Sequence, residues 1–117
     1  HMNDSTDAAD WSHSYEDSNL RARCENFYNN WLPSNIKPYI RASTARCSYG
    51  DYVFVFDHDY DGWFYYDKSA FHNASGAEVK VWERGDDRAY TFTGNGVTDE
   101  DVDPHTSLGF VPCFEIG

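Results

Sequence analysis

The spacing of apolar residues along the chain changes near Gly50. Between Pro33 and Gly50 these residues recur at i, i+3 and i+4, a spacing that puts them on one face of a helix. Ser34 or Asn35 stands where an N-cap is needed, so this segment predicts the one helix of the chain. The positions that form the pattern are Ile36, Tyr39, Ile40 and Ser43.

After Gly50 the period becomes two, and aromatic and β-branched residues fill runs that are typical of strands. Clusters of Gly, Asp, Asn and Ser separate the runs. The predicted strands are 52–56, 63–66, 78–82, 88–93 and 109–114. The sequence therefore predicts an α+β fold, in which one helix packs on a twisted antiparallel β-sheet.

Alternation within the predicted strands divides their side chains between two faces. On the core side, against the helix, we expect four valines: Val53, Val55, Val79 and Val81. His58, Glu78 and Arg88 then share the opposite face, where charged groups stay in contact with water. This open face is the expected site.

Two regions are expected along the 117-residue chain. Residues 1–18 are acidic and lack a period, which predicts a flexible arm, and residues 19–117 form a single domain. We interpret His1 and Met2 as a cloning scar. Three cysteines and 18% aromatic residues are typical of a small extracellular domain with one disulfide and one remaining thiol. A reduced cytosolic protein is the alternative.

The formal net charge is −11, from 9 Lys and Arg against 20 Asp and Glu. Ordinary nucleic-acid binders neutralise phosphates with basic patches, so this charge argues against that class. It leaves open an enzyme that needs cations only at one phosphate, and an acidic surface that binds a basic partner. No apolar run is long enough for a membrane span, so we expect no membrane contact, and we expect a monomer.

Four short stretches carry a family resemblance: CENFY at 24–28, FDHDYDGW at 56–63, GDDRAYTF at 85–92 and HTSLGFVPC at 105–113. In this order they resemble the small secreted guanyl-specific ribonucleases of fungi and the ribonuclease-like effectors of plant-pathogenic fungi. The resemblance implies the microbial ribonuclease fold, secretion, a Cys24–Cys113 disulfide and action on single-stranded RNA. It also suggests His58, Arg88 and His105 as active-site residues.

The residue types in this set cleave RNA without a metal, because RNA carries its own nucleophile, the 2′-hydroxyl. Glu78 would take the hydroxyl proton as general base, and protonated His105 would give a proton to the 5′-oxygen. Arg88 and protonated His58 would stabilise the charge on the phosphate, and the product would be a 2′,3′-cyclic phosphate. Glu83 is the open alternative to Glu78 as the base.

Four residues are expected to contact the substrate: Phe56, Tyr60, Asp61 and Phe110. Tyr60 and Phe110 offer faces for stacking a base, and Asp61 accepts its hydrogen bonds. Asp59 alone separates His58 from Tyr60, whereas the family has a longer loop that contacts guanine. We therefore expect only a weakened purine or guanine preference. The alternative function is a virulence effector with weak or no catalysis, which binds RNA or host proteins after delivery into host cells.

A rival motif for calcium is weak. Asp57, Asp59, Asp61 and Gly62 match the start of a calcium loop, but Lys68 stands where a glutamate is required. The histidines show no metal-ligand spacing. The sequence therefore predicts no metal and no cofactor.

Overall fold

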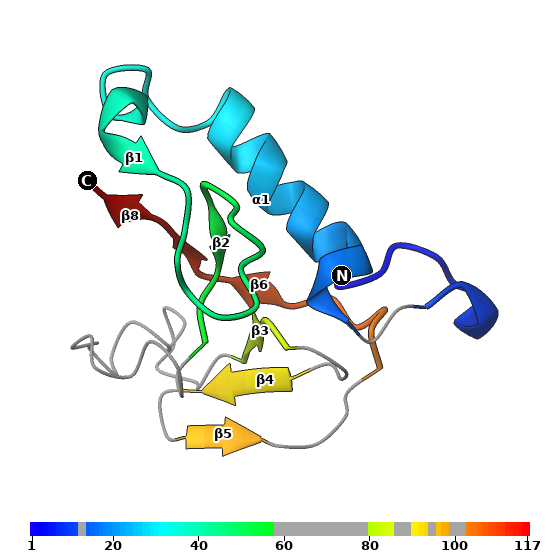
Figure 1. Cartoon of the computed structure of the whole chain (residues 1–117). Coiled ribbons are helices and arrows are strands. Elements are labelled where there is room, and N and C mark those ends of the chain that lie inside the picture. Colours follow the sequence, from blue (N-terminus) through cyan, green and yellow to red (C-terminus); the bar gives the residue numbers. More distant parts are fainter. Residues whose placement is uncertain (12–13, 58–79, 86–89, 94–95, 99–102) are drawn as a thin grey trace, which may run out of the picture.

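The structure, a computed structural model, describes residues 1–11, 14–57, 80–85, 90–93, 96–98 and 103–117. These residues form an α+β domain in which one α-helix lies along short strands (Figure 1). The helical elements are η1 (Ala8–Asp10), η2 (Tyr15–Asp17), α1 (Asn19–Asn30) and η3 (Lys37–Tyr39). The strands are β1 (Ile40–Arg41), β2 (Phe54–Val55), β3 (Val81–Glu83), β4 (Tyr90–Thr93), β5 (Gly96–Thr98), β6 (Gly109–Phe110), β7 (Pro112–Cys113) and β8 (Glu115–Ile116).

Helix α1 begins at a serine cap and is held by a regular apolar face. The side chain of Ser18 accepts a hydrogen bond from the backbone N–H of Arg21 at 3.2 Å. The residues that face the core are Leu20, Cys24, Phe27 and Tyr28, at i, i+4, i+7 and i+8. The helix ends where Trp31 donates to the carbonyl of Phe27, two residues before Pro33.

The helix predicted between Pro33 and Gly50 is not formed, and this expectation is wrong. The segment contains only the 3-10 turn η3 and strand β1. Pro38 lies inside it and has no N–H to donate to a helical hydrogen bond. Ile40 and Arg41 instead pair antiparallel with Ile116 and Glu115, so the tertiary contact with β8 replaces helical hydrogen bonding.

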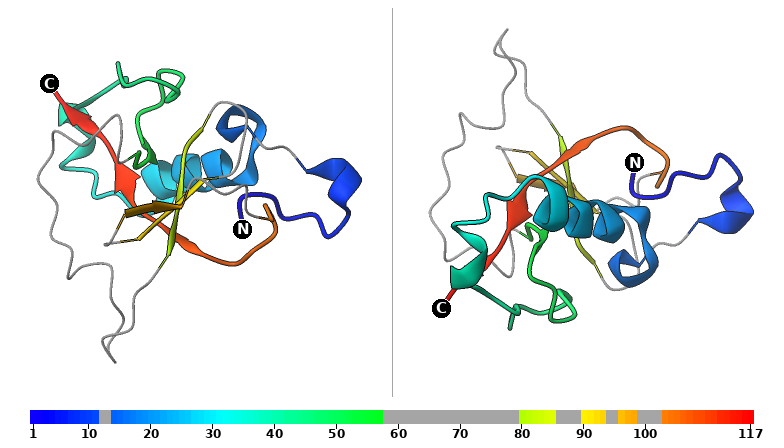
Figure 2. Two further views of the ribbon diagram at one scale, coloured as in Figure 1. Left: turned by 90° about the horizontal axis from the view of Figure 1, so that it is seen from below. Right: turned by 90° about the horizontal axis from the view of Figure 1, so that it is seen from above.

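The strands form three small sheets with the orders β1-β8, β2-β7 and β5-β4-β3-β6. All pairs are antiparallel except β3 with β6, which run parallel with Trp82 opposite Phe110. Strands β2, β3, β4, β6 and β7 overlap the predicted runs, whereas 63–66 lies outside the described residues. Both views in Figure 2 show α1 crossing the middle of the molecule, with β8 beyond its C-terminal end.

Two clusters of buried side chains form the core of the described residues. The larger one joins α1 to the strands and consists of Met2, Tyr15, Leu20, Cys24, Val53, Val55 and Trp82. The smaller one contains Phe56 and Val81, with Val111 and Cys113 against them. The helix-facing positions of Val53 and Val55 are therefore confirmed. Val81 was expected in the same layer, but Trp82 occupies it instead, because alternation sets which residues share a face and not which face is covered.

The N-terminal arm is packed, which differs from the flexible arm expected for residues 1–18. Met2 and Tyr15 are fully buried in the larger cluster. The backbone of Asn3 donates to the carbonyl of Pro104 at 2.9 Å, and Leu20 donates to the carbonyl of Met2 at 3.1 Å. The acidic composition of this segment gave no sign that Met2 and Tyr15 would be buried. Their burial fixes the position of the arm against the domain.

A buried guanidinium joins β3 to the loop before β2. Arg84 is 1% exposed, donates to the carbonyls of Val55 at 2.6 Å and Arg46 at 2.8 Å, and lies over the ring of Phe54. The loop contains Cys47 and Tyr49 with φ of 58° and 56°, a region that disfavours residues with a Cβ atom. The Arg84 contacts therefore help to hold a strained loop in place.

Replacing this residue, Arg84→Ala, is expected to lower the free energy of unfolding by about 2–4 kcal/mol, since the buried carbonyl of Val55 and the part-buried carbonyl of Arg46 lose their donor and Phe54 loses a packing partner. Urea unfolding measures the change. The control is Arg41→Ala, which removes an exposed ion pair with Glu115 and should cost less than about 1 kcal/mol. Equal losses in the two variants would contradict an anchoring role for Arg84.

Candidate functional site

Five of the predicted site residues lie outside the described residues: His58, Tyr60, Asp61, Glu78 and Arg88. Their convergence on one face therefore stays a prediction. Glu83, the alternative general base, is 2% exposed in β3 and pairs in register with Tyr90. A carboxylate buried to this degree is poorly placed to reach an RNA chain.

His105 is half-buried and is held by the N-terminal arm. Its backbone N–H donates to the side chain of Asp103 at 2.8 Å, and its Nδ1 lies 3.1 Å from the carbonyl oxygen of Asn3. Because a carbonyl only accepts, this contact makes Nδ1 the donor and leaves Nε2 for a second partner. The ring also lies 4.2 Å from the ring of His1, measured between centroids.

Three aromatic residues were predicted to contact the substrate; Tyr60 lies outside the described residues, Phe56 is buried and Phe110 is half-buried. Phe56 is 7% exposed in the smaller cluster, and its N–H donates to Val111. Phe110 packs against the larger cluster, beside its register partner Trp82. The expectation that Phe56 contacts the substrate is wrong, because its ring has almost no exposed surface that a ligand could reach. Phe110 is half-buried on the helix side rather than on the open face.

The Cys24–Cys113 disulfide is not present in the structure. Cys24 is a free, buried thiol in the larger cluster, beside the hydroxyl of Tyr15. Cys113 packs in the smaller cluster, and its thiol donates to the carbonyl of Val111 at 3.7 Å. The pairing stays a prediction. Cys24 lies in the larger cluster with Val55, whereas Cys113 packs in the smaller cluster with Phe56. Because successive side chains of an extended segment point in opposite directions, the disulfide would have to join cysteines from two separate clusters.

A groove of about 580 Å³ runs between α1 and the segment 50–53; we call it the α1 groove. Its wall carries four carboxylates and two tyrosines: Glu16, Asp17, Glu25, Asp51, Tyr28 and Tyr52. The rings of Tyr28 and Tyr52 stack at 5.1 Å between centroids and 16° between planes. The groove therefore combines negative charge with aromatic surface.

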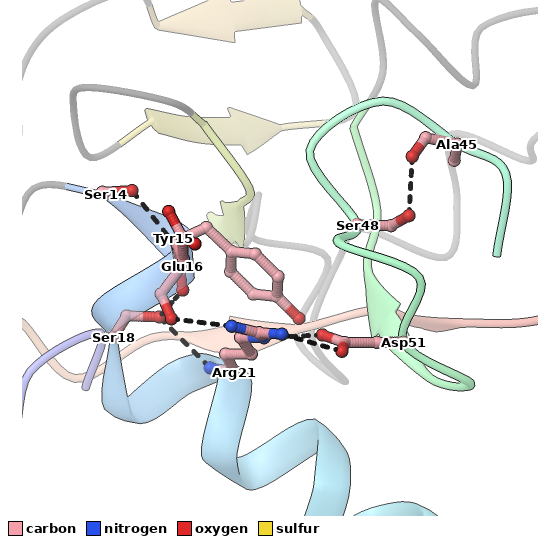
Figure 3. Close-up of polar contacts among 8 residues, drawn as sticks. All are labelled: Ser14, Tyr15, Glu16, Ser18, Arg21, Ala45, Ser48 and Asp51. Carbon is pink, nitrogen blue, oxygen red and sulfur yellow. Dashed lines mark hydrogen bonds and ion pairs between the residues drawn. The ribbon is translucent and has the colours of Figure 1, made fainter. Parts of the chain in front are cut away.

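Among the described residues, one cation lines the α1 groove, and it is already paired. The guanidinium of Arg21 binds both carboxylate oxygens of Asp51, at 2.8 and 3.0 Å (Figure 3). The hydrogen bond with Asp51 raises the pKa of Arg21. Arg21 also lies 5.1 Å from the ring centroid of Tyr49, and Lys37 Nζ lies 5.1 Å from that of Tyr28.

Behind the Arg21–Asp51 pair lies the buried hydroxyl of Tyr15, which points toward this pair in Figure 3. It lies near the thiol of Cys24 and the backbone of Val55. Neither contact has the geometry of a hydrogen bond, and no other described residue provides an acceptor. Burial raises the pKa of Tyr15 far above its usual range, so the hydroxyl stays protonated as a donor.

A second groove, of about 570 Å³, lies on the side where the N-terminal arm meets the C-terminal segment. Arg23, Ser107 and Phe110 line it together with His1, whose ring contacts His105. Arg23 is paired with Asp4 at 2.6 Å. This groove brings two of the predicted site residues, His105 and Phe110, into one neighbourhood.

Neither a metal centre nor a membrane span is found in the described part of the chain. Within it, no group of three or more His, Cys, Asp or Glu side chains is arranged to hold a metal ion. No helix there is long and apolar enough to cross a membrane.

Cys24 is expected to react slowly with iodoacetamide, since burial raises the pKa of its thiol to about 11 and shields the sulfur. At about pH 8 in native protein, labelling of Cys24 should be at least ~10-fold slower than labelling of the half-buried Cys47. Mass spectrometry of the peptides gives both rates. Fast labelling of Cys24, or a peptide that joins Cys24 to Cys113, would contradict the structure.

The same thiol predicts a loss of stability in alkali. The pKa of Cys24 is raised from 9.0 to about 11, so the folded state favours the neutral thiol. The contribution of this thiol to the free energy of unfolding is fully present below about pH 9 and is lost as the pH rises through about 11. The free energy of unfolding should fall across this window in the wild type and fall less steeply in Cys24→Ala. A Cys47→Ala control should keep the wild-type slope, and identical slopes in all three proteins would contradict the assignment.

Comparison with known proteins gives no relatives for this chain. No protein-family model, curated protein or solved structure matches it. The resemblance to the fungal ribonucleases therefore rests on the sequence stretches alone, and the function has to be argued from the residues described above.

Proposed function

We propose that this chain is a secreted, ribonuclease-like α+β protein that acts by binding a protein partner, as an effector with weak or no catalysis. The observation that carries the proposal is the placement of Phe56 and Phe110. Both were expected to contact the substrate, but Phe56 is buried in the smaller cluster and Phe110 is half-buried against the larger one. A ring that packs in the core is poorly available for stacking a nucleotide base.

The charge of the chain supports the same proposal. A formal charge of −11 opposes the approach of a polyanion, which binds by displacing counterions with Lys and Arg. Two described arginines that could meet a phosphate are already paired, Arg21 with Asp51 and Arg23 with Asp4. A partner with basic side chains fits this surface better than RNA does.

The second candidate is the endoribonuclease itself, and the geometry of His105 favours it. The contact of Nδ1 with the carbonyl of Asn3 orients the ring and leaves Nε2 to donate a proton to a leaving group. In this candidate Glu78 is the base, and Arg88 and His58 stabilise the phosphate. These three residues lie outside the described part of the chain.

An RNA cleavage assay in chelator separates the two candidates. A labelled single-stranded RNA is incubated with wild type and with His105→Ala across about pH 4–8, a range that includes both the ordinary carboxylate and imidazole pKa values. The proposal expects no cleavage that depends on His105. Cleavage by wild type that is lost in His105→Ala, with both proteins folded, would replace it with the endoribonuclease. If both proteins cleave the RNA equally and only slightly, the activity comes from a contaminating nuclease, and the result agrees with the proposal.

A further inference from the structure

We propose that the α1 groove is the site where this protein binds its partner, and that the segment bound is a short basic peptide rich in Lys or Arg. This inference rests on the proposed binding function and names the chemistry of the partner. It is carried by the shape of the groove, by the charges on its wall, and by the lysine that lies over the ring of Tyr28.

The groove is large enough for several side chains. Its volume of about 580 Å³ falls within the range of known ligand pockets, roughly 300–1,000 Å³. One side is α1, whose position is set by the burial of Leu20 and Cys24, and the other is the segment that leads into β2. Because the groove lies between two packed elements, its side chains are already held in place. Binding therefore costs little conformational entropy on the side of the protein.

The charges on the wall leave an unbalanced negative potential. Arg21 neutralises Asp51, but Glu16, Asp17 and Glu25 have no cation within ion-pair distance among the described residues. Carboxylates that share one concave wall repel one another and attract a cation strongly. A Lys or Arg side chain would relieve this repulsion.

Tyr28, a tyrosine of the groove, and Tyr49, next to the lining residue Gly50 in the chain, each have a cation over the ring. Lys37 lies over Tyr28, and Arg21 lies over Tyr49. Tyr52, which stacks on Tyr28, is 46% exposed and offers further ring surface inside the groove. An ammonium or guanidinium group gains from both the ring face and the carboxylates, whereas a neutral or anionic ligand gains from neither.

The buried hydroxyl of Tyr15 adds an independent reason for binding at this place. It points toward the Arg21–Asp51 pair and has no hydrogen-bond acceptor among the described residues, which is costly for a buried donor. An incoming cation that replaces Arg21 at one oxygen of Asp51 allows a small rotation of the carboxylate, which brings an oxygen to this hydroxyl. Binding then satisfies a donor that the unbound protein leaves unsatisfied.

The experiment uses the full chain and fluorescein-labelled hexa-arginine and hexalysine peptides as probes, with fluorescence anisotropy as the readout. The groove variant is Glu16→Gln with Glu25→Gln. The matched control is Asp7→Asn with Asp10→Asn, which removes the same charge from the arm, away from the groove. We expect the groove variant to raise the Kd at least ~10-fold and the control to change it less than ~2-fold. Circular dichroism confirms that each variant is folded.

A third variant tests the contribution of the tyrosine ring to binding without changing the charge of the groove. Tyr52→Leu should weaken binding by about two- to fivefold, the usual worth of an exposed cation–π contact. Three results would overturn the proposal: equal losses in the groove variant and its control, no effect of Tyr52→Leu, or no saturable binding of either peptide below about 1 mM. Because anisotropy reads peptide binding and the RNA assay reads cleavage, a failure of the groove is distinguishable from a failure of the proposed function.

Discussion

The burial of Trp82 between α1 and β2 is the contact on which the rest of the structure depends. Trp82 is fully buried in the cluster that also contains Leu20, Cys24 and Val55, so helix, strand and N-terminal arm meet at one indole ring. The strands span only two to four residues each, and so few ladder hydrogen bonds cannot hold a sheet without packing. Each fully buried apolar side chain contributes about 1.5–3 kcal/mol, so this cluster supplies much of what holds the described elements together.

Two arginines of the described residues connect segments of this packed core. With a net charge of −11, the chain repels itself, and its few cations are used at positions where they join segments. Arg84 joins β3 to the strained loop before β2, and Arg21 joins α1 to Asp51. Three carboxylates without an ion pair among the described residues, Glu16, Asp17 and Glu25, line the α1 groove. They make this wall of the groove acidic.

The ribonuclease resemblance and the structure agree on the class of fold and differ on the use of particular side chains. Phe56 and Phe110 were expected to contact the substrate, but Phe56 is buried and Phe110 is half-buried against the larger cluster. His105 keeps an orientation suited to proton transfer, although it lies beside the N-terminal arm rather than on an open sheet face. The burial of Phe56 is one of the observations on which the proposal of a binding function rests.

The sequence by itself indicated the segments that contain β2, β3, β4, β6 and β7, and which residues share a side of these strands, because alternation is a property of the extended backbone. It also carried the signal of α1, in apolar residues at i, i+4, i+7 and i+8 from Leu20, but the acidic, asparagine-rich surroundings concealed it. Only the tertiary structure decided that Trp82 rather than Val81 faces the helix and that Met2 is in the core. It also decided that Ile40 pairs with Ile116. These outcomes depend on contacts between residues far apart in the chain, and no local pattern specifies which of two apolar surfaces will be covered.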